Sequence, residues 1–571
     1  MTRLNEENIF QQRILTTCII VTLIIAPNFG TDPINIIKLA ALIVGLLLAL
    51  SIHLRPLSCF SSFLDKFTII IGFCFLLFSV ISLFVSKQSK IEQIWGAWGR
   101  STGLLSYLCF FLLFIAGYYI ASTLGVGELS KGFSKLIIPF LAYGVLQVFH
   151  LDPIPWSRKE VFSTLGNTNF ASAMYAFLGL YVMTRIIFRN MRGKETFVNF
   201  MLIIVILFVM HRTNSIQGPL IFLIGVIFLF LLKFWNLQKL VLFYLLFVTS
   251  LTFGAVAFLG LLNRGPLASI VFQETLAFRT DYWRAGISMI KASPGIGFGF
   301  DSYGDYYRQY RDLLATVRTG PERVSNTAHN IFIDMGVNSG VIVMILALTI
   351  FLRPLFMGLK RMHKGVVKNE NEIFFHVFNL VYFIQALISI NQIGIGVWGW
   401  LICGALTGIM SNKSKSPSSI EVTRVTAGSS EHKRLRRNRI LGTSDHKSSL
   451  SARQLMVSYA TLLISVPIVL FPLITDNRVM HVVSDLNNPV ARTSVILPDP
   501  ATLTIGQGEL VLNTLAITGS EKTLTYAEKL HEENPRSIYA LRVIRQLGET
   551  PEARSQADEA IRILDPMNSN P

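Results

Sequence analysis

The chain has 571 residues and a mass of 64.0 kDa; 51% of the residues are hydrophobic, only 15% are charged, and the mean hydropathy is +0.51. Soluble domains carry about 25% charged residues, so this composition excludes a string of soluble domains and predicts that most of the chain faces lipid. The 51 Lys and Arg against 34 Asp and Glu give a net charge of +17. In a soluble protein this charge would suggest nucleic acid, but in a membrane protein an excess of basic residues in cytoplasmic loops is a competing cause.

Runs without Asp, Glu, Lys or Arg, each near the length of a spanning helix, recur along the chain. They cover residues 14–31, 39–54, 67–86, 104–127, 136–151, 165–184, 196–211, 213–232, 240–263, 335–352, 373–412 and 454–475. The 373–412 run is too long for one helix, and residues 391–396 near its middle are typical of a tight turn. The sequence therefore predicts an all-α polytopic membrane protein with about thirteen transmembrane helices.

The distribution of charge fits an N-terminus on the cytoplasmic side, because the connections that then lie inside are rich in Lys and Arg. Residues 411–455 alone hold ten Lys and Arg against three acidic residues, a net +7, and we interpret them as a basic cytoplasmic linker. Much of the +17 thus follows from membrane topology. No nucleic-acid partner is expected.

Three further segments follow from this topology. Residues 264–334 form a large extracytoplasmic loop between helices 9 and 10 of a membrane domain that covers 1–410. Residues 456–475 form an additional transmembrane helix, which places the tail, 476–571, outside the membrane. The tail carries nine basic and thirteen acidic residues, and a net negative charge is typical of a translocated segment.

The tail contains two similar phrases. Tyr526-Ala527-Glu528-Lys529-Leu530 before Pro535 is followed by Ala557-Asp558-Glu559-Ala560-Ile561 before Pro566. The 31 residues from one proline to the other are close to the ~34 of a tetratricopeptide repeat, but an ordinary helical hairpin fits equally well. We expect a helical-hairpin, tetratricopeptide-like tail that either docks an envelope protein partner or acts as a scaffold.

The large loop is rich in arginine. Arg279, Arg284, Arg308 and Arg311 are candidates for a cationic pocket, because guanidinium groups stay charged and bind phosphate oxygens in pairs. Contacts with lipid headgroups, or solvated helix faces, are the alternative. The glycines at 295, 297 and 299 are interpreted as a close backbone turn, since no strand–helix unit surrounds them.

His329 lies just before the tenth predicted helix, at the outer mouth of the bundle. A histidine there is a candidate base for a hydroxyl, because its pKa lies near the working pH. The alternative is an interfacial histidine that caps the helix together with Asn330. Histidines elsewhere in the chain have no comparable setting.

Other polar positions predicted in outer turns are weaker candidates for substrate binding. Trp95 and Trp98 suggest an aromatic belt, and Arg100 beside them is within reach of a phosphate. Asn167 and Asn169 begin the sixth predicted helix, and Arg212 lies in the turn between the seventh and eighth.

The sequence lacks several catalytic signatures. It contains no Walker A loop, no Asp-x-Asp pair, no His-Glu-x-x-His and no Cys/His cluster. We therefore expect no cofactor and no bound metal. Few acidic residues fall in the middle of the predicted helices, which argues against an ion-coupled transporter.

Four features in this order resemble the O-antigen ligase and polymerase superfamily, which includes bacterial protein O-oligosaccharyltransferases. They are Leu165-Gly166-Asn167-Thr168-Asn169-Phe170-Ala171; Arg279 and Trp283 before Pro294-Gly295-Ile296-Gly297-Phe298-Gly299; the large outer loop; and His329-Asn330 with Phe332 at the start of the next helix. The resemblance covers about residues 10–410.

The resemblance implies a metal-independent glycosyltransferase in the cytoplasmic (inner) membrane. Its donor would be a polyprenyl-diphosphate-linked glycan such as an undecaprenyl diphosphate, and its acceptor a hydroxyl of a glycan, lipid or protein at the outer face. Arg279 would hold the diphosphate and His329 would activate the acceptor. Substrate-binding roles are then expected for Arg284, Arg212, Arg100, Asn330, Asn167, Asn169 and Arg308.

One position departs from the pattern of the superfamily. Many members carry Ser-Arg after the seventh helix, where this chain has Ser215-Ile216, and Arg212 is the candidate substitute. The alternative function is a transporter or flippase of lipid-linked glycans, although the two halves of the chain lack the paired polar breaks that such a protein would need.

Overall fold

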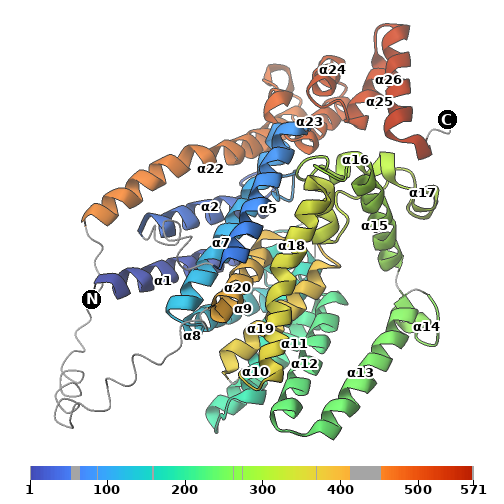
Figure 1. The fold of residues 1–571 in the computed structure, drawn as a ribbon. Coiled ribbons are helices and arrows are strands. Elements are labelled where there is room, and N and C mark those ends of the chain that lie inside the picture. Colours follow the sequence, from blue (N-terminus) through green and yellow to red (C-terminus); the bar gives the residue numbers. More distant parts are fainter. Residues whose placement is uncertain are drawn as a thin grey trace.

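A computed structural model describes residues 2–52, 65–86, 88–156, 160–261, 263–272, 274–367, 369–411 and 452–568. The described residues form helices and no strand. A bundle of long helices makes up most of the molecule, and the C-terminal helices sit at one end of it, next to the large loop (Figure 1). We call this the loop end of the bundle. The predicted linker, apart from its boundary residues, lies outside the described residues.

Helices occupy all twelve predicted runs, and two of them share the 373–412 run. They are α1 (Thr2–Leu23), α2 (Asn35–Ile52), α5 (Lys66–Val85), α7 (Leu104–Thr123), α8 and α9 (Gly127–Ser134 and Ile137–Val148, one run), α10 (Thr168–Phe188), α11 (Lys194–Arg212), α12 (Gln217–Asn236), α13 (Leu240–Leu261), α18 (Ile331–His363), α19 (Glu370–Ala386), α20 (Ile393–Ser411) and α22 (Ala452–Asn487). Ten helices in the described part of the chain are long and apolar enough to cross a membrane, counting α8 and α9 together. The three that do not meet this standard are α1, which begins with charged residues, and the shorter α2 and α19.

The break in the 373–412 run lies earlier than predicted. The helices α19 and α20 are joined by residues 387–392, so the predicted turn at 391–396 is wrong by several residues. Gln392 accepts a hydrogen bond from the backbone of Ile395 at 3.1 Å and so starts α20. Gly394 lies inside the helix, where a Cβ atom would come within 2.6 Å of Leu165. This glycine therefore serves close packing and not a turn.

The centre of the bundle is the contact between α7 and α20. Gly404 and Gly408 of α20 face α7 so closely that a Cβ atom would stand 1.9 Å and 2.4 Å from the carbonyl oxygens of Phe114 and Tyr118. Glycines four residues apart let two membrane helices touch through their backbones, which replaces the missing hydrophobic driving force with close packing. The two helices are accordingly among the most buried in the described structure.

The large loop begins after α13 and forms α14 (Ala268–Val271), α15 (Glu274–Ala292), α16 (Tyr303–Tyr310) and α17 (Leu313–Thr319). It is fixed to α18 by a backbone contact. α18 is kinked at Gly340, which has φ +86°, and the segment 294–299 lies against the kink. The amide of Val341 donates to Pro294 at 2.8 Å, and that of Phe298 donates to the carbonyl of Val337 at 2.8 Å. The glycines of this segment thus form the predicted close turn.

The tail is larger than the predicted hairpin. α22 continues past residue 475 to Asn487, and four helices follow: α23 (Ile505–Ile517), α24 (Thr523–Glu533), α25 (Ile538–Leu547) and α26 (Pro551–Leu564). The two similar phrases fall in α24 and α26. A small apolar core that includes Leu512, Leu530 and Leu541 holds these helices together. The tetratricopeptide-like character of the tail stays a prediction.

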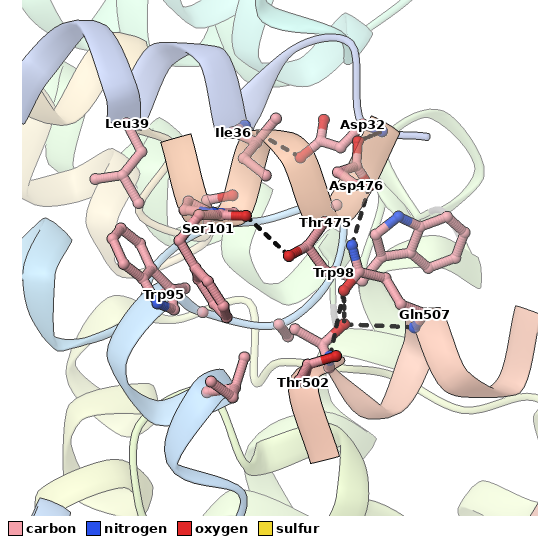
Figure 2. A pocket seen from close by; sticks show the side chains of 17 residues that line it. Asp32, Ile36, Leu39, Trp95, Trp98, Ser101, Thr475, Asp476, Thr502 and Gln507 are labelled. Atoms are coloured by element: carbon pink, nitrogen blue, oxygen red, sulfur yellow. Dashed lines mark hydrogen bonds between the residues drawn. The ribbon is translucent and has the colours of Figure 1, made fainter. Parts of the chain in front are cut away.

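A polar joint attaches α22 and α23 to the loop end of the bundle (Figure 2). Asp476 of α22 accepts hydrogen bonds from the Thr31 hydroxyl, from the backbone amide of Asp32 at 2.9 Å and from the side chain of Gln507 at 3.0 Å. The cavity beside this joint measures only about 30 Å³, which is room for on the order of two water molecules. The joint is therefore structural.

Ion pairs connect the end of the tail with the large loop. Asp565, which is 1% exposed, accepts from Arg311 at 2.7 Å and from Arg308 at 2.9 Å. Arg542 of α25 forms a two-point bond with Glu322 at 2.7 Å. We call Asp565, Arg308 and Arg311 the loop–tail clasp. A buried charge that loses its partner lowers stability strongly, so these pairs hold the tail against the loop.

The clasp gives a prediction about stability. Asp565→Asn should lower the free energy of unfolding by about 3 kcal/mol or more, because it leaves the fully buried Arg311 without its countercharge. The protein in detergent should melt at a lower temperature, and protease should cleave the tail sooner. Asp558→Asn is the matched control, since Asp558 pairs only with the exposed Arg545 and Arg562; it should cost no more than about 1 kcal/mol. Equal melting temperatures for the two variants would contradict the clasp.

Candidate functional site

His329 is held by the start of α18. The side chain of Asp334 accepts a hydrogen bond from the amide of Ala328 at 2.8 Å, and the Thr327 hydroxyl oxygen accepts from the amide of His329 at 3.1 Å. Asn330 caps the helix by accepting from the amides of residues 332 and 333 at 3.0 and 3.1 Å. His329 itself has φ +52°. A non-glycine residue in this left-handed region persists only where its surroundings fix it, and these bonds do so.

One wall beside His329 is supplied by α15. The ring of Tyr282 stacks on the imidazole with 5.6 Å between centroids and 26° between planes. The carbonyl of Tyr282 in turn accepts a hydrogen bond from the Tyr303 hydroxyl at 2.6 Å. Tyr303 belongs to the small core of the loop, together with Ala285, Met289 and Tyr307. The position of the imidazole is thus fixed through an aromatic contact to a packed scaffold.

Two arginines complete the surroundings of His329. Arg279 lies one turn before Tyr282 on α15, and Arg100 lies in the connection before α7. Burial lowers the pKa of His329, and the positive charges of Arg100 and Arg279 lower it further, to about 3. The imidazole is therefore neutral at physiological pH and has a lone pair that can accept a proton. The structure thus brings three of the predicted site residues together.

Neither of these two arginines forms an ion pair in the described chain, although Asp301 and Asp334 are near enough to act on the charge of Arg100. The buried Nη1 of Arg100 has no hydrogen-bond acceptor among the described residues, and no hydrogen bond or ion pair joins Arg279 to any part of the described chain. By contrast, Arg318 donates to Asp281 at 2.9 Å, and the other loop arginines below are paired too. An unpaired buried guanidinium is costly, so an anion is the ligand that would satisfy it.

Arg284 and Arg308 are engaged elsewhere. Arg284 bonds Asp312 and Asp281, each at 2.7 Å, and Arg308 belongs to the loop–tail clasp with Arg311. The predicted pocket of four loop arginines is therefore wrong as a group, because three of its members pair with carboxylates. Only Arg279 lies beside His329.

The other predicted positions form a second group near the start of α10. Asn167 caps α10 by accepting from the amide of Asn169 at 2.8 Å, and Asn169 accepts from the Ser215 hydroxyl at 2.7 Å. Arg212 ends α11 and is exposed. These bonds connect α10 to the turn before α12. Within the described chain, no hydrogen bond, ion pair or ring contact joins this group to His329. Asn330 caps α18, as the alternative interpretation predicted.

Two carboxylates that the sequence did not single out shape the site. Asp301 accepts from the amides of Ala97 and Thr102 at 3.0 and 3.2 Å, and so fixes the loop that carries Arg100. Asp334 fixes the backbone before His329. Asp334 offered only a weak signal, since acidic residues are ordinary in the first turn of a helix, where they interact favourably with its dipole. Asp301 offered no such signal.

Among the described residues, no cluster of three or more His, Cys, Asp or Glu has the arrangement of a metal site.

The chain is similar to known proteins over part of its length. Residues 212–348 match the family described as O-Antigen ligase, and this range contains both Arg279 and His329 but neither Arg100 nor the tail. The chain is also similar to the exopolysaccharide production protein ExoQ of Rhizobium meliloti (strain 1021), with 29% identity over 156 residues. That match covers 26% of this chain and 34% of the relative, so the chain spans about a third of the length of the curated relative it matches.

The charge around His329 predicts its titration. In the protein without substrate, the imidazole should stay neutral well below the ordinary histidine pKa of about 6.5, and Arg100→Ala should raise its pKa because one repelling charge is removed. Histidine-selective NMR in detergent micelles measures this, with His329→Gln to assign the signal. Because the unfolded chain binds this proton and the folded chain does not, acidification below pH 6.5 should also lower stability. Titration of His329 near pH 6.5 would contradict the described surroundings.

Proposed function

Because the chain belongs to the O-antigen ligase and polymerase superfamily, we propose that it transfers a glycan from a polyprenyl-diphosphate carrier to an acceptor hydroxyl. The proposal places the reaction at the outer face of the cytoplasmic membrane, in the biosynthesis of a surface polysaccharide or glycoprotein. The single observation that carries it is the buried Nη1 of Arg100, which has no hydrogen-bond acceptor in the described chain and whose positive charge lowers the pKa of His329.

In this proposal Arg279 and Arg100 bind the diphosphate of the donor. A diphosphate carries negative charge and offers several oxygens in the geometry that guanidinium groups recognise. As the bond between the glycan and the diphosphate breaks, negative charge grows on the leaving oxygen, and fixed positive charges stabilise it most in a site with little water. The two arginines thereby take the part that a metal ion plays in other transferases.

His329 is the proposed base. The oxygen of the acceptor hydroxyl bonds to the anomeric carbon of the donor glycan, the bond to the diphosphate oxygen breaks, and the hydroxyl proton passes to the imidazole. The free protein has a weak base, since burial, Arg100 and Arg279 hold the pKa of His329 at about 3. A bound diphosphate offsets the two positive charges and raises this pKa. His329 would thus gain basicity only when the donor is present.

The acceptor decides between a ligase, a polymerase and a protein glycosyltransferase. Loss of long chains with single repeats retained in a deletion strain would identify a polymerase, whereas loss of attachment to lipid or protein would identify a ligase. Arg212 at the end of α11, and Asn167 and Asn169 at the start of α10, stay proposed contacts of the substrate. Asn330, as the cap of α18, contributes by fixing the backbone of His329.

Single substitutions test the assignment. Arg279→Ala and Arg100→Ala should each lower the rate of glycan transfer about 10²- to 10³-fold, the range seen when one stabilising donor is removed from an active site. His329→Ala should lower it by about 10²- to 10⁴-fold. The assay uses purified protein with a polyprenyl-diphosphate glycan and measures release of the carrier.

Arg318→Ala is the matched control. Arg318 is a loop arginine that is more exposed than Arg279; it pairs with Asp281 and has no role in the proposed site. Its removal should change the rate less than about fivefold, the effect of one exposed ion pair. If Arg318→Ala were as damaging as Arg279→Ala, the loop would merely need its charge to fold, and the proposed role of Arg279 would be wrong.

A further inference from the structure

A second and larger cavity lies away from Arg279. It is a cleft of about 580 Å³ between the large loop and the tail, which is within the ~300–1,000 Å³ of most small-molecule sites. The residues of α16 and of the connection 322–326 line one side, and residues of α23 and α25 line the other. Figure 1 shows these tail helices above α16. The cleft exists only because the tail docks on the loop.

The lining of the cleft combines aromatic rings with neutral and acidic oxygen acceptors. Trp98 is 36% exposed and packs its ring over Gly506 of α23. Tyr539 donates its hydroxyl to Asn513 at 2.8 Å, which fixes the phenol and leaves further lone pairs toward the cleft. Asn326 lies opposite and is exposed. Rigid aromatic faces beside amides and hydroxyls suit a ligand with apolar ring faces and many hydroxyl groups.

The arginines of the cleft are not available for an anion. Arg308 is bound in the loop–tail clasp, and Arg542 forms its two-point bond with Glu322. Arg536 lies 3.6 Å above the ring of Tyr306 and donates to Gln309 at 2.7 Å. Carboxylates therefore outnumber unpaired cations, which disfavours phosphates, nucleic acid and acidic lipid headgroups.

The acidic groups of the cleft are partly neutral. Burial and the negative charge of Glu509 raise the pKa of Asp305 to about 8. A protonated carboxyl both donates and accepts a hydrogen bond, as a sugar hydroxyl does. This suppresses the net negative charge that would attract a basic peptide, and it favours a neutral ligand.

The cleft and the proposed catalytic site draw residues from the same two segments of the chain. Asn326 stands three residues before His329, and Trp98 stands two residues before Arg100. Asp301, which fixes the Arg100 loop, also lines the cleft. The segments that carry His329 and Arg100 therefore also contribute residues to the cleft.

We propose that the cleft between the large loop and the C-terminal tail binds an oligosaccharide, namely the part of the glycan chain that lies next to the bond being made. This inference rests on the proposed function for the nature of its ligand. In it, Trp98 and Tyr539 contact sugar rings, and Asn326, Asn513 and Asp305 bond their hydroxyls. The tail thereby becomes a part of the substrate site and selects for chain length.

The test uses the full-length protein in detergent and two readouts. The probe is the surface polysaccharide of the source strain, hydrolysed to fragments of one to six repeats without the carrier. Saturation-transfer NMR measures the binding of each fragment, and this does not require catalysis. We expect affinity to increase with fragment length in the wild type, and Tyr539→Ala and Asn326→Ala to weaken the binding of long fragments at least fivefold. Gln556→Ala, on an exposed position of α26 outside the cleft, is the matched control and should retain that binding.

The second readout is transfer with acceptors of the same lengths. Tyr539→Ala should raise KM for long acceptors at least fivefold more than for single repeats, whereas kcat should change little. Equal effects on short and long acceptors, or no effect on either, would overturn the proposal. The proposal would also be overturned if a lysine-rich peptide bound in the cleft and the glycan fragments did not compete with it.

The two proposals fail in distinguishable ways. A wild-type protein that binds the fragments but transfers no glycan would refute the proposed function and retain the cleft as a glycan site. A protein that transfers glycan but whose cleft variants bind and transfer like the wild type would refute only the cleft.

Discussion

The seating of the large loop on the kink of α18 is the contact on which the site depends. At Gly340 a Cβ atom would stand 2.4 Å from the carbonyl oxygen of Gly295, so only glycine lets the loop backbone lie against the helix there. This contact fixes the end of α15 beside the start of α18. It thereby sets Tyr282 against His329, although the two residues lie far apart in sequence.

Electrostatics then separates structural arginines from functional ones. Four arginines of the loop, Arg284, Arg308, Arg311 and Arg318, are paired with carboxylates of the loop or of the tail. Arg279, with Arg100 from another connection, is left without such a partner beside a neutral histidine. An unpaired charge in a buried position lowers stability, and proteins retain such costs mainly where a ligand or a reaction needs them. The same reasoning that removes Arg284 and Arg308 from the site thus strengthens the case for Arg279.

The C-terminal tail is attached to the membrane domain at two points. The clasp at Asp565 and the joint at Asp476 hold it against the loop end of the bundle at two separate points. Two attachments restrict rotation as well as distance, so the cleft between tail and loop keeps its shape. These two attachments support the proposal that the helical tail forms one wall of a site.

The sequence predicted what depends on local composition. The apolar runs coincide with helices because hydropathy is a property of neighbouring residues, and His329 and Arg279 were found from their places beside a span and in a loop. Most of the ion pairs could not be predicted from the sequence. Arg284 and Asp281 are three residues apart and could have been paired on a helix face, but Asp312 lies 28 residues away and Asp565 lies 254 residues from Arg311. The glycines after Gln392 led to a wrong prediction of the turn, because a glycine used for packing has the same sequence signal as one in a turn.

The central claim is that Arg100, Arg279 and His329 form one site for a diphosphate. The most direct measurement is the pKa of His329 by NMR in the presence and absence of inorganic pyrophosphate. The account predicts that saturating pyrophosphate raises this pKa by at least one unit from about 3, since the anion offsets both arginines, and that Arg279→Ala weakens the effect. An unchanged pKa with pyrophosphate bound elsewhere, or no binding at all, would contradict it.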